Sequence, residues 1–210
     1  MTAMRNFTKL FFLAGLSVAA ASCGDVATTG RSPVYLVIDK IEGIPGGSTA
    51  GTPSGFLLSD VQSLVTKPDP CTTTSPCPTT YNDNGAVTFH LSQKDITSIV
   101  GPTSNNQVTI TRYRVNYRRA DGRNTPGVDV PYGFDGAFTL TVPVTTGASS
   151  SFELVRHAAK MESPLVQLIT NDTVITTLAE ITFYGQDVVG NEIQATGTIQ
   201  VNFGNFADRN

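Results

Sequence analysis

The sequence of 210 residues contains no tryptophan, only two histidines and only three cysteines, and Asp, Glu, Lys and Arg together make up 15% of it. An average soluble domain contains about 25% of these charged residues. The low charge content argues against coiled coils, helical bundles and charged disordered tails. The formal net charge of −3 excludes a generally basic nucleic-acid-binding protein, so we expect no nucleic-acid partner.

The sequence signatures of common enzymes are also missing. The chain has no Gly-x-Ser-x-Gly nucleophile elbow, no His-Glu-x-x-His helix and no glycine-rich phosphate-binding loop. His90 falls on the polar face of a predicted strand and His157 at the end of another, where a solvated imidazole is the default interpretation. Seventeen scattered acidic residues leave a two-carboxylate glycosidase as the enzyme alternative. We expect a non-enzymatic protein without a cofactor or a bound metal.

No hydrophobic run reaches the roughly 20 residues that a membrane-spanning helix needs. The apolar residues 11–21 follow the basic side chains of Arg5 and Lys9 and end in the small residues Ala20-Ala21-Ser22. A basic region, a short apolar region and small residues at a cleavage site are typical of an export signal. We therefore predict a signal peptide over residues 1–22.

The residue after this signal is Cys23. The segment Ala20-Ala21-Ser22-Cys23 resembles the lipobox of bacterial lipoproteins, although Ala20 stands where that family usually has leucine. The resemblance implies that acyl chains, palmitate among them, are attached at Cys23 and hold the protein in the membrane of the bacterial cell envelope. Gly24, in place of the aspartate that favours inner-membrane retention in that family, favours the outer membrane. The other interpretation is an ordinary cleaved signal followed by an unrelated cysteine.

The two remaining cysteines, Cys71 and Cys77, should form a disulfide in an oxidising compartment. Closing so short a loop contributes roughly 2.4 kcal/mol in the chain-entropy model. A zinc site would need more ligands nearby, and a redox motif would need a closer spacing. The sequence thus predicts a flexible tether at 23–32, then a domain at 33–205 with a disulfide-clipped surface loop at 67–85.

Alternating apolar and polar residues predict short strands through most of that domain, because successive side chains of a strand point to opposite sides. A first strand, 34–38, should end at Asp39, and the shift in parity between Ile110 and Tyr113 predicts a bulge near Thr111. A helical turn fits only 156–168, which Pro164 interrupts. The expected fold is an all-β, antiparallel immunoglobulin-like β-sandwich of about seven to nine strands. The other strands are expected around 56–58, 61–65, 87–92, 108–119, 138–144, 152–154 and 193–203.

The C-terminal quarter strengthens this expectation. An aromatic strand, 180–184, runs into the turn Asp187-Val-Val-Gly190-Asn191, which resembles the last hairpin of bacterial immunoglobulin-like and fibronectin-III-like modules. Asp187 and Asn191 offer two oxygen ligands, whereas Ca²⁺ takes six to eight. The favoured interpretation is an Asx turn in which Asp187 accepts hydrogen bonds from backbone amides.

Charge is unevenly distributed at one place only. Five of the 14 Lys and Arg residues fall within residues 112–123, and Arg112, Arg114 and Arg118 share one strand parity. They would form a basic stripe whose guanidinium groups suit a carboxylate or phosphate ligand. The favoured alternative is cross-strand pairing with acidic residues of neighbouring strands.

Export, anchoring and the missing catalytic signatures agree on a non-enzymatic binding or assembly module. Its expected partners are the membrane, through Cys23, and another envelope protein or surface polymer. The alternative is a carbohydrate-binding or carbohydrate-processing surface lipoprotein. An exposed, coplanar pair of tyrosines would favour that alternative, whereas Tyr113 and Tyr117 have inward parity.

Overall fold

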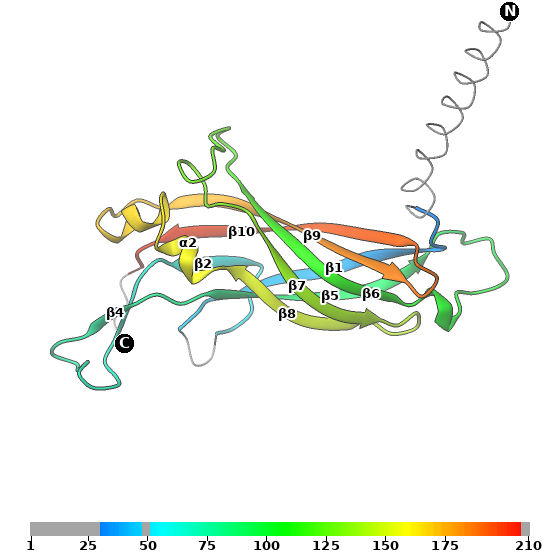
Figure 1. Ribbon diagram of the computed structural model, residues 1–210, viewed down its shortest axis with the longest axis horizontal. Coiled ribbons are helices and arrows are strands. Elements are labelled where there is room, and N and C mark those ends of the chain that lie inside the picture. Colours follow the sequence, from blue (N-terminus) through cyan, green and yellow to red (C-terminus); the bar gives the residue numbers. More distant parts are fainter. Residues whose placement is uncertain (1–29, 48–50, 207–210) are drawn as a thin grey trace, which may run out of the picture.

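A computed structural model of the chain describes residues 30–47 and 51–206, in which two β-sheets pack face to face along an elongated domain (Figure 1). The predicted signal peptide, Cys23 and most of the predicted tether lie outside these residues. Within the described ranges, no helix is long and apolar enough to cross a membrane.

Among the described residues, eight strands form the sandwich, three in one sheet and five in the other. The three-stranded sheet has the order β1 (Val34–Ile44), β5 (Asp83–Gln93), β8 (Ala148–Val155). The five-stranded sheet has the order β2 (Phe56–Asp60), β10 (Glu192–Gly204), β9 (Ile175–Asp187), β6 (Val108–Arg118), β7 (Phe134–Val142). Two further strands, β3 (Ser63–Val65) and β4 (Cys77–Thr79), pair with each other.

This topology confirms the predicted all-β sandwich. Strands β1, β5 and β8 correspond to strands A, B and E of an immunoglobulin-like domain, and β6, β9 and β10 to strands C, F and G of the facing sheet. Between the strands that the structure describes, every ladder is antiparallel except that between β2 and β10, which is parallel. The predicted number of strands also fits the eight of the sandwich.

The core lies between the sheets and is rich in aromatic rings. Phe183 of β9 is fully buried, and its ring centroid lies 5.0 Å from that of Phe89, 5.3 Å from that of Phe152 and 5.4 Å from that of Phe138. These edge-to-face and tilted contacts join β9 to strands of both sheets. The ring cluster is therefore the centre of the packing between the sheets.

Two tyrosines connect the sheets by hydrogen bonds as well as by packing. Tyr113 and Tyr117 of β6 are buried, as their parity predicts. The Tyr117 hydroxyl donates to the Leu154 carbonyl oxygen at 2.7 Å, and the Tyr113 hydroxyl donates to that of Glu153 at 3.0 Å. Burial raises the pKa of both phenols, so they remain protonated donors at neutral pH.

The bulge predicted near Thr111 is confirmed, because the register of β6 against both neighbours shifts between Ile110 and Arg112. The predicted end of the first strand at Asp39 is wrong. A bulge between Ile38 and Lys40 lets β1 continue to Ile44, paired with β5. The polar residue Asp39 lies within this bulge and does not end the strand.

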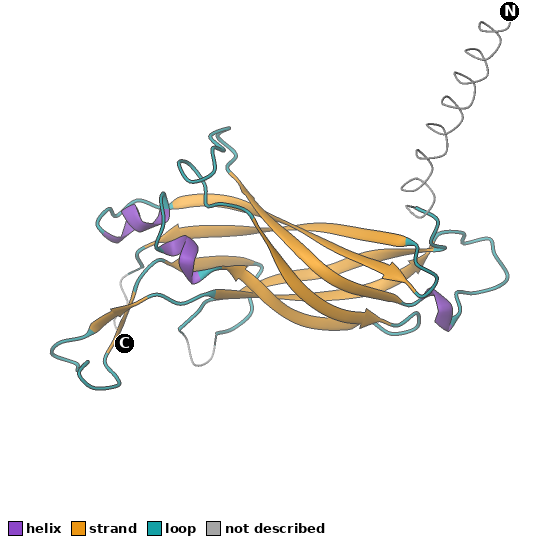
Figure 2. Ribbon diagram, viewed as in Figure 1, coloured by secondary structure: helices purple, strands orange, loops and turns teal. Residues whose placement is uncertain are grey.

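Short helices lie at the ends of the sandwich, and strands make up most of the rest (Figure 2). Helix α2 (His157–Lys160) and the 3₁₀ helix η2 (Leu165–Ile169) occupy the predicted helical segment, with Pro164 between them. A further 3₁₀ turn, η1 (Ser104–Asn106), was not predicted. The predicted loop 67–85 contains β4 and the start of β5, so it is shorter than expected.

Candidate functional site

A hollow of about 470 Å³ lies where the first residues of β1 meet the adjoining ends of β9 and β10. Buried Val34 and Leu36 contribute apolar lining, and Glu192 and Gln194 of β10 add polar groups. We call this feature the Tyr184 hollow. Its remaining lining residues are Gly30, Tyr35, Lys94, Thr111, Arg112, Tyr184, Gly185, Gln186 and Ile193.

Two cation–aromatic pairs define the chemistry of the Tyr184 hollow. The Arg112 guanidinium carbon lies 3.7 Å from the Tyr184 ring centroid, and the Lys94 Nζ lies 5.0 Å from that of Tyr35. Arg112 and Tyr184 are directly opposite each other in the ladder between β6 and β9. The hollow thus offers cations, amides and a carboxylate for binding a ligand, and neither histidine lines it.

The three arginines of the predicted basic stripe lie on the outer face of the five-stranded sheet, and each has an acidic partner. Arg114 and Arg112 place a guanidinium nitrogen 2.9 Å and 3.6 Å from the carboxylate oxygens of Asp135 on β7, and Arg118 lies 3.7 Å from Glu180 on β9. This is the cross-strand pairing that the sequence favours. Exposed pairs of this kind contribute at most about 1 kcal/mol each. Binding of an anionic ligand by the stripe stays a prediction.

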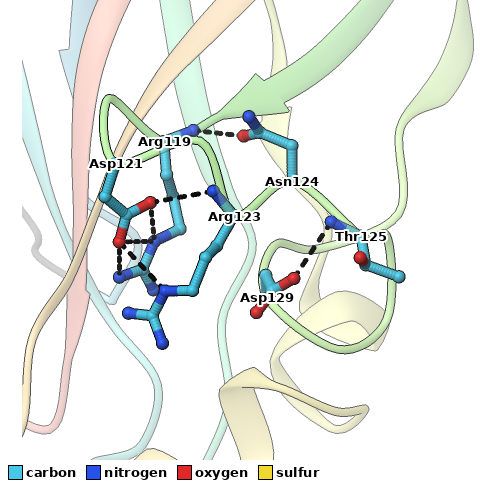
Figure 3. Close-up of polar contacts among 6 residues, drawn as sticks. All are labelled: Arg119, Asp121, Arg123, Asn124, Thr125 and Asp129. Carbon is cyan, nitrogen blue, oxygen red and sulfur yellow. Dashed lines mark hydrogen bonds and ion pairs between the residues drawn. The ribbon is translucent and has the colours of Figure 1, made fainter.

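The remaining arginines of the basic segment order the loop between β6 and β7 (Figure 3). The Asp121 carboxylate accepts hydrogen bonds from the side chains of Arg119 and Arg123, the shortest at 2.6 Å from Arg119 Nη2. The Arg119 amide donates to Asn124 Oδ1 at 2.6 Å. The bonds from Arg119 hold the pKa of Asp121 well below its usual range. The charged side chains of Arg119 and Arg123 are therefore paired with Asp121 of the same loop.

The Asp187 carboxylate closes the β9–β10 turn. Its Oδ1 accepts from the amides of Val189 at 3.1 Å and Asn191 at 2.8 Å, and its Oδ2 accepts from Asn191 Nδ2 at 2.8 Å. This confirms the Asx-turn interpretation. Within the described ranges, no group of three or more His, Cys, Asp or Glu residues could hold a metal ion.

We predict that Asp187 makes the domain sensitive to acid. Desolvation raises the pKa of this carboxyl, but hydrogen bonds from Asn191, Ser32 and Val189 outweigh it and hold the pKa below its usual value. A lowered native pKa contributes stability that is complete above the unfolded pKa of about 4 and is lost as the pH falls through the native value. In thermal melts, Asp187→Asn should therefore show a smaller fall in Tm from pH 6 to pH 3 than the wild type. Equal falls would contradict this role.

A buried ion pair and a hydrogen bond to it connect three elements, α2, β5 and β2, at the end of the sandwich where α2 lies. Lys160 Nζ is 2.8 Å from Asp83 Oδ2, and both side chains are 1% exposed. Asp83 also accepts from the Ser59 hydroxyl at 2.6 Å and from the Gly46 amide at 2.7 Å. Lys160 lies on α2, Asp83 on β5 and Ser59 on β2, and Gly46 follows β1. The pair therefore connects parts of the sandwich to one another, and we assign it a structural role.

The sulfur atoms of Cys71 and Cys77 are bonded, as predicted. Together with β3, β4 and the residues between them, the bond forms what we call the clipped hairpin. Figure 1 places β4 at the end of the domain opposite the start of β1. Most side chains of residues 67–76 are exposed, and the Thr72 and Ser75 backbones exchange two hydrogen bonds. The hairpin is thus an ordered projection rather than part of the core.

The two histidines occupy unrelated surface positions. His90 Nδ1 lies 2.6 Å from Asp39 Oδ1 at the bulge of β1, and both side chains are about 40% exposed or more. His157 begins helix α2 and is exposed.

The sequence does not predict Tyr35, Lys94 and Tyr184 as site residues. They lie far apart in the sequence, and only the fold brings them to one hollow.

No family model matches the chain, and the comparisons with curated proteins and with solved structures give no match either.

Proposed function

We propose that this chain is a lipid-anchored, non-enzymatic module of the bacterial cell envelope that binds another envelope protein or surface polymer through its clipped hairpin. The anchor is the acylated Cys23 that the lipobox resemblance implies. Two or three acyl chains make membrane attachment effectively permanent. Gly24 favours the outer membrane.

The observation that carries this proposal is the position of the clipped hairpin. The described chain begins at one end of an elongated sandwich, and the hairpin lies at the other (Figure 1). A tether at the first end would therefore hold the hairpin away from the lipid surface. The disulfide and the hydrogen bonds between Thr72 and Ser75 order the end of the clipped hairpin in the unbound protein. Preorganisation of this kind lowers the entropic cost of binding.

Carbohydrate binding receives less support from the geometry. Glycan-binding platforms commonly present free aromatic ring faces, and Tyr113 and Tyr117 are buried in the core. The rings of Tyr35 and Tyr184 line a hollow, but Lys94 and Arg112 lie over them. The Tyr184 hollow therefore ranks below the clipped hairpin as a docking surface for a surface polymer.

Site-specific photo-cross-linking in intact cells tests the proposed docking tip. A photoreactive residue at Thr73, which is exposed in the clipped hairpin, should give a discrete cross-linked product. The matched control is Thr139, which is exposed on β7 of the sandwich. Products of equal yield at both positions, or none at Thr73, would contradict docking through the hairpin.

The disulfide should be needed for docking but not for folding. We expect the double variant Cys71→Ser, Cys77→Ser to lose no more than about 2.4 kcal/mol of unfolding free energy, because the bond closes a short loop outside the core. It should still melt as one cooperative unit while the Thr73 cross-link disappears. An unfolded double variant would mean that the bond supports the core, and a retained cross-link would mean that it does not shape the docking tip.

A further inference from the structure

Five aliphatic side chains lie in solvent on two loops at one end of the sandwich. Ile96, Ile99 and Val100 of the β5–β6 loop are 90%, 100% and 69% exposed, and Val188 and Val189 of the β9–β10 turn are 58% and 70% exposed. We call them the aliphatic rim. It includes the four most exposed large hydrophobic side chains among residues 30–47 and 51–206. Single exposed aliphatic residues are common on protein surfaces, whereas a group of them marks an interaction site.

Both loops are attached to the first residues of the described chain. The Lys94 amide donates to the Pro33 carbonyl oxygen at 2.9 Å, and Lys94 Nζ donates to that of Gly30 at 3.0 Å. The Ser32 side chain hydrogen-bonds to Asp187, which closes the β9–β10 turn. The aliphatic rim therefore flanks the point at which the chain joins the sandwich, and Figure 1 shows both loops at that end.

The length of chain between this point and Cys23 limits how far the rim can lie from an anchor. Gly30 follows Cys23 by seven residues. Even a fully extended chain covers no more than about 3.6 Å per residue, which gives about 25 Å in total. A bilayer that held acyl chains at Cys23 would therefore lie within reach of the aliphatic rim.

We propose that the aliphatic rim inserts into the interfacial region of the bilayer that holds the anchor, and so fixes the orientation of the sandwich with the clipped hairpin pointing away from the lipid. This inference rests on the proposed acylation of Cys23. Transfer of aliphatic side chains from water to the boundary between headgroups and acyl chains lowers the free energy of the system. The acidic residue of the β5–β6 loop is Asp95, directly before Ile96, and its Oδ1 already accepts hydrogen bonds from the Thr97 amide and hydroxyl at 2.9 Å and 2.7 Å. These bonds replace part of the hydration that Asp95 would lose at the interface.

The depth of single labelled positions in proteoliposomes tests the proposal. The mature lipoprotein is reconstituted into phosphatidylethanolamine–phosphatidylglycerol vesicles after Ile99→Cys or Val189→Cys substitution and attachment of an environment-sensitive fluorophore. With Cys23 acylated and the other two cysteines bonded, the introduced thiol is the free one. Met161→Cys is the control, since Met161 is 63% exposed and follows α2 at the opposite end.

We expect blue-shifted emission and quenching by nitroxide-labelled acyl chains at positions 99 and 189, and neither effect at position 161. Flotation of the vesicles separates the two ways of failing. If the protein floats with the vesicles but all three labels remain in water, the rim proposal is wrong and the anchor stands. If the wild-type lipoprotein does not float with the vesicles, the proposed acylation of Cys23 is wrong, and the rim proposal, which rests on it, is wrong as well.

Discussion

Replacing Lys160 by methionine should lower the free energy of unfolding by about 3–5 kcal/mol, the range found when one partner of a buried ion pair is removed. The Asp83 carboxylate would then stay 1% exposed with no cation beside it. Its remaining bonds from Ser59 and Gly46 come from neutral donors. Urea denaturation followed by circular dichroism measures the loss.

Two comparisons make this prediction specific to the buried pair. Lys40→Met removes a lysine that is 58% exposed and pairs with Glu42, and it should change the stability by less than about 1 kcal/mol. Adding Asp83→Asn to Lys160→Met should restore part of the loss, because no unpaired charge then remains buried. A loss for Lys160→Met no larger than that for Lys40→Met would show that the pair does not hold α2 to the sandwich.

Phe183→Ala should also lower the free energy of unfolding strongly, by about 3–5 kcal/mol, because it leaves a cavity among the four aromatic rings that surround Phe183. Phe183 is fully buried, and its ring contacts those of Phe89, Phe138 and Phe152 as well as that of Tyr113. The same substitution at Phe56, which is 47% exposed on β2, should cost far less. Similar losses for the two variants in chemical denaturation would contradict a core centred on Phe183.

The regular parts of the fold could be predicted from the sequence because a strand with one buried face must alternate. This periodicity predicts the buried faces of β5, β8 and β10, and a change of parity places the bulge of β6 near Thr111. Pro164 likewise separates α2 from η2. In each case the deciding interactions are local, so a few neighbouring residues carry the information.

Features that depend on contacts between distant segments could not be predicted in this way. The continuation of β1 beyond Asp39 depends on its pairing with β5, about 50 residues later. The burial of Lys160 depends on Asp83, and nothing beside Lys160 in the sequence distinguishes it from a surface lysine. The Tyr184 hollow likewise needs β1, β6, β9 and β10 to meet. The fold class is therefore easier to predict than the site.

Metabolic labelling with palmitate is the most direct test of the central claim that this sandwich is anchored by lipid at Cys23. The wild-type protein should incorporate the label, and the Cys23→Ala variant should incorporate none, because the acyl chains have no other proposed attachment point. Immunoblotting of both proteins controls for their amounts. Label retained in Cys23→Ala, or absent from a well-expressed wild type, would contradict the anchor and favour an ordinary cleaved signal peptide.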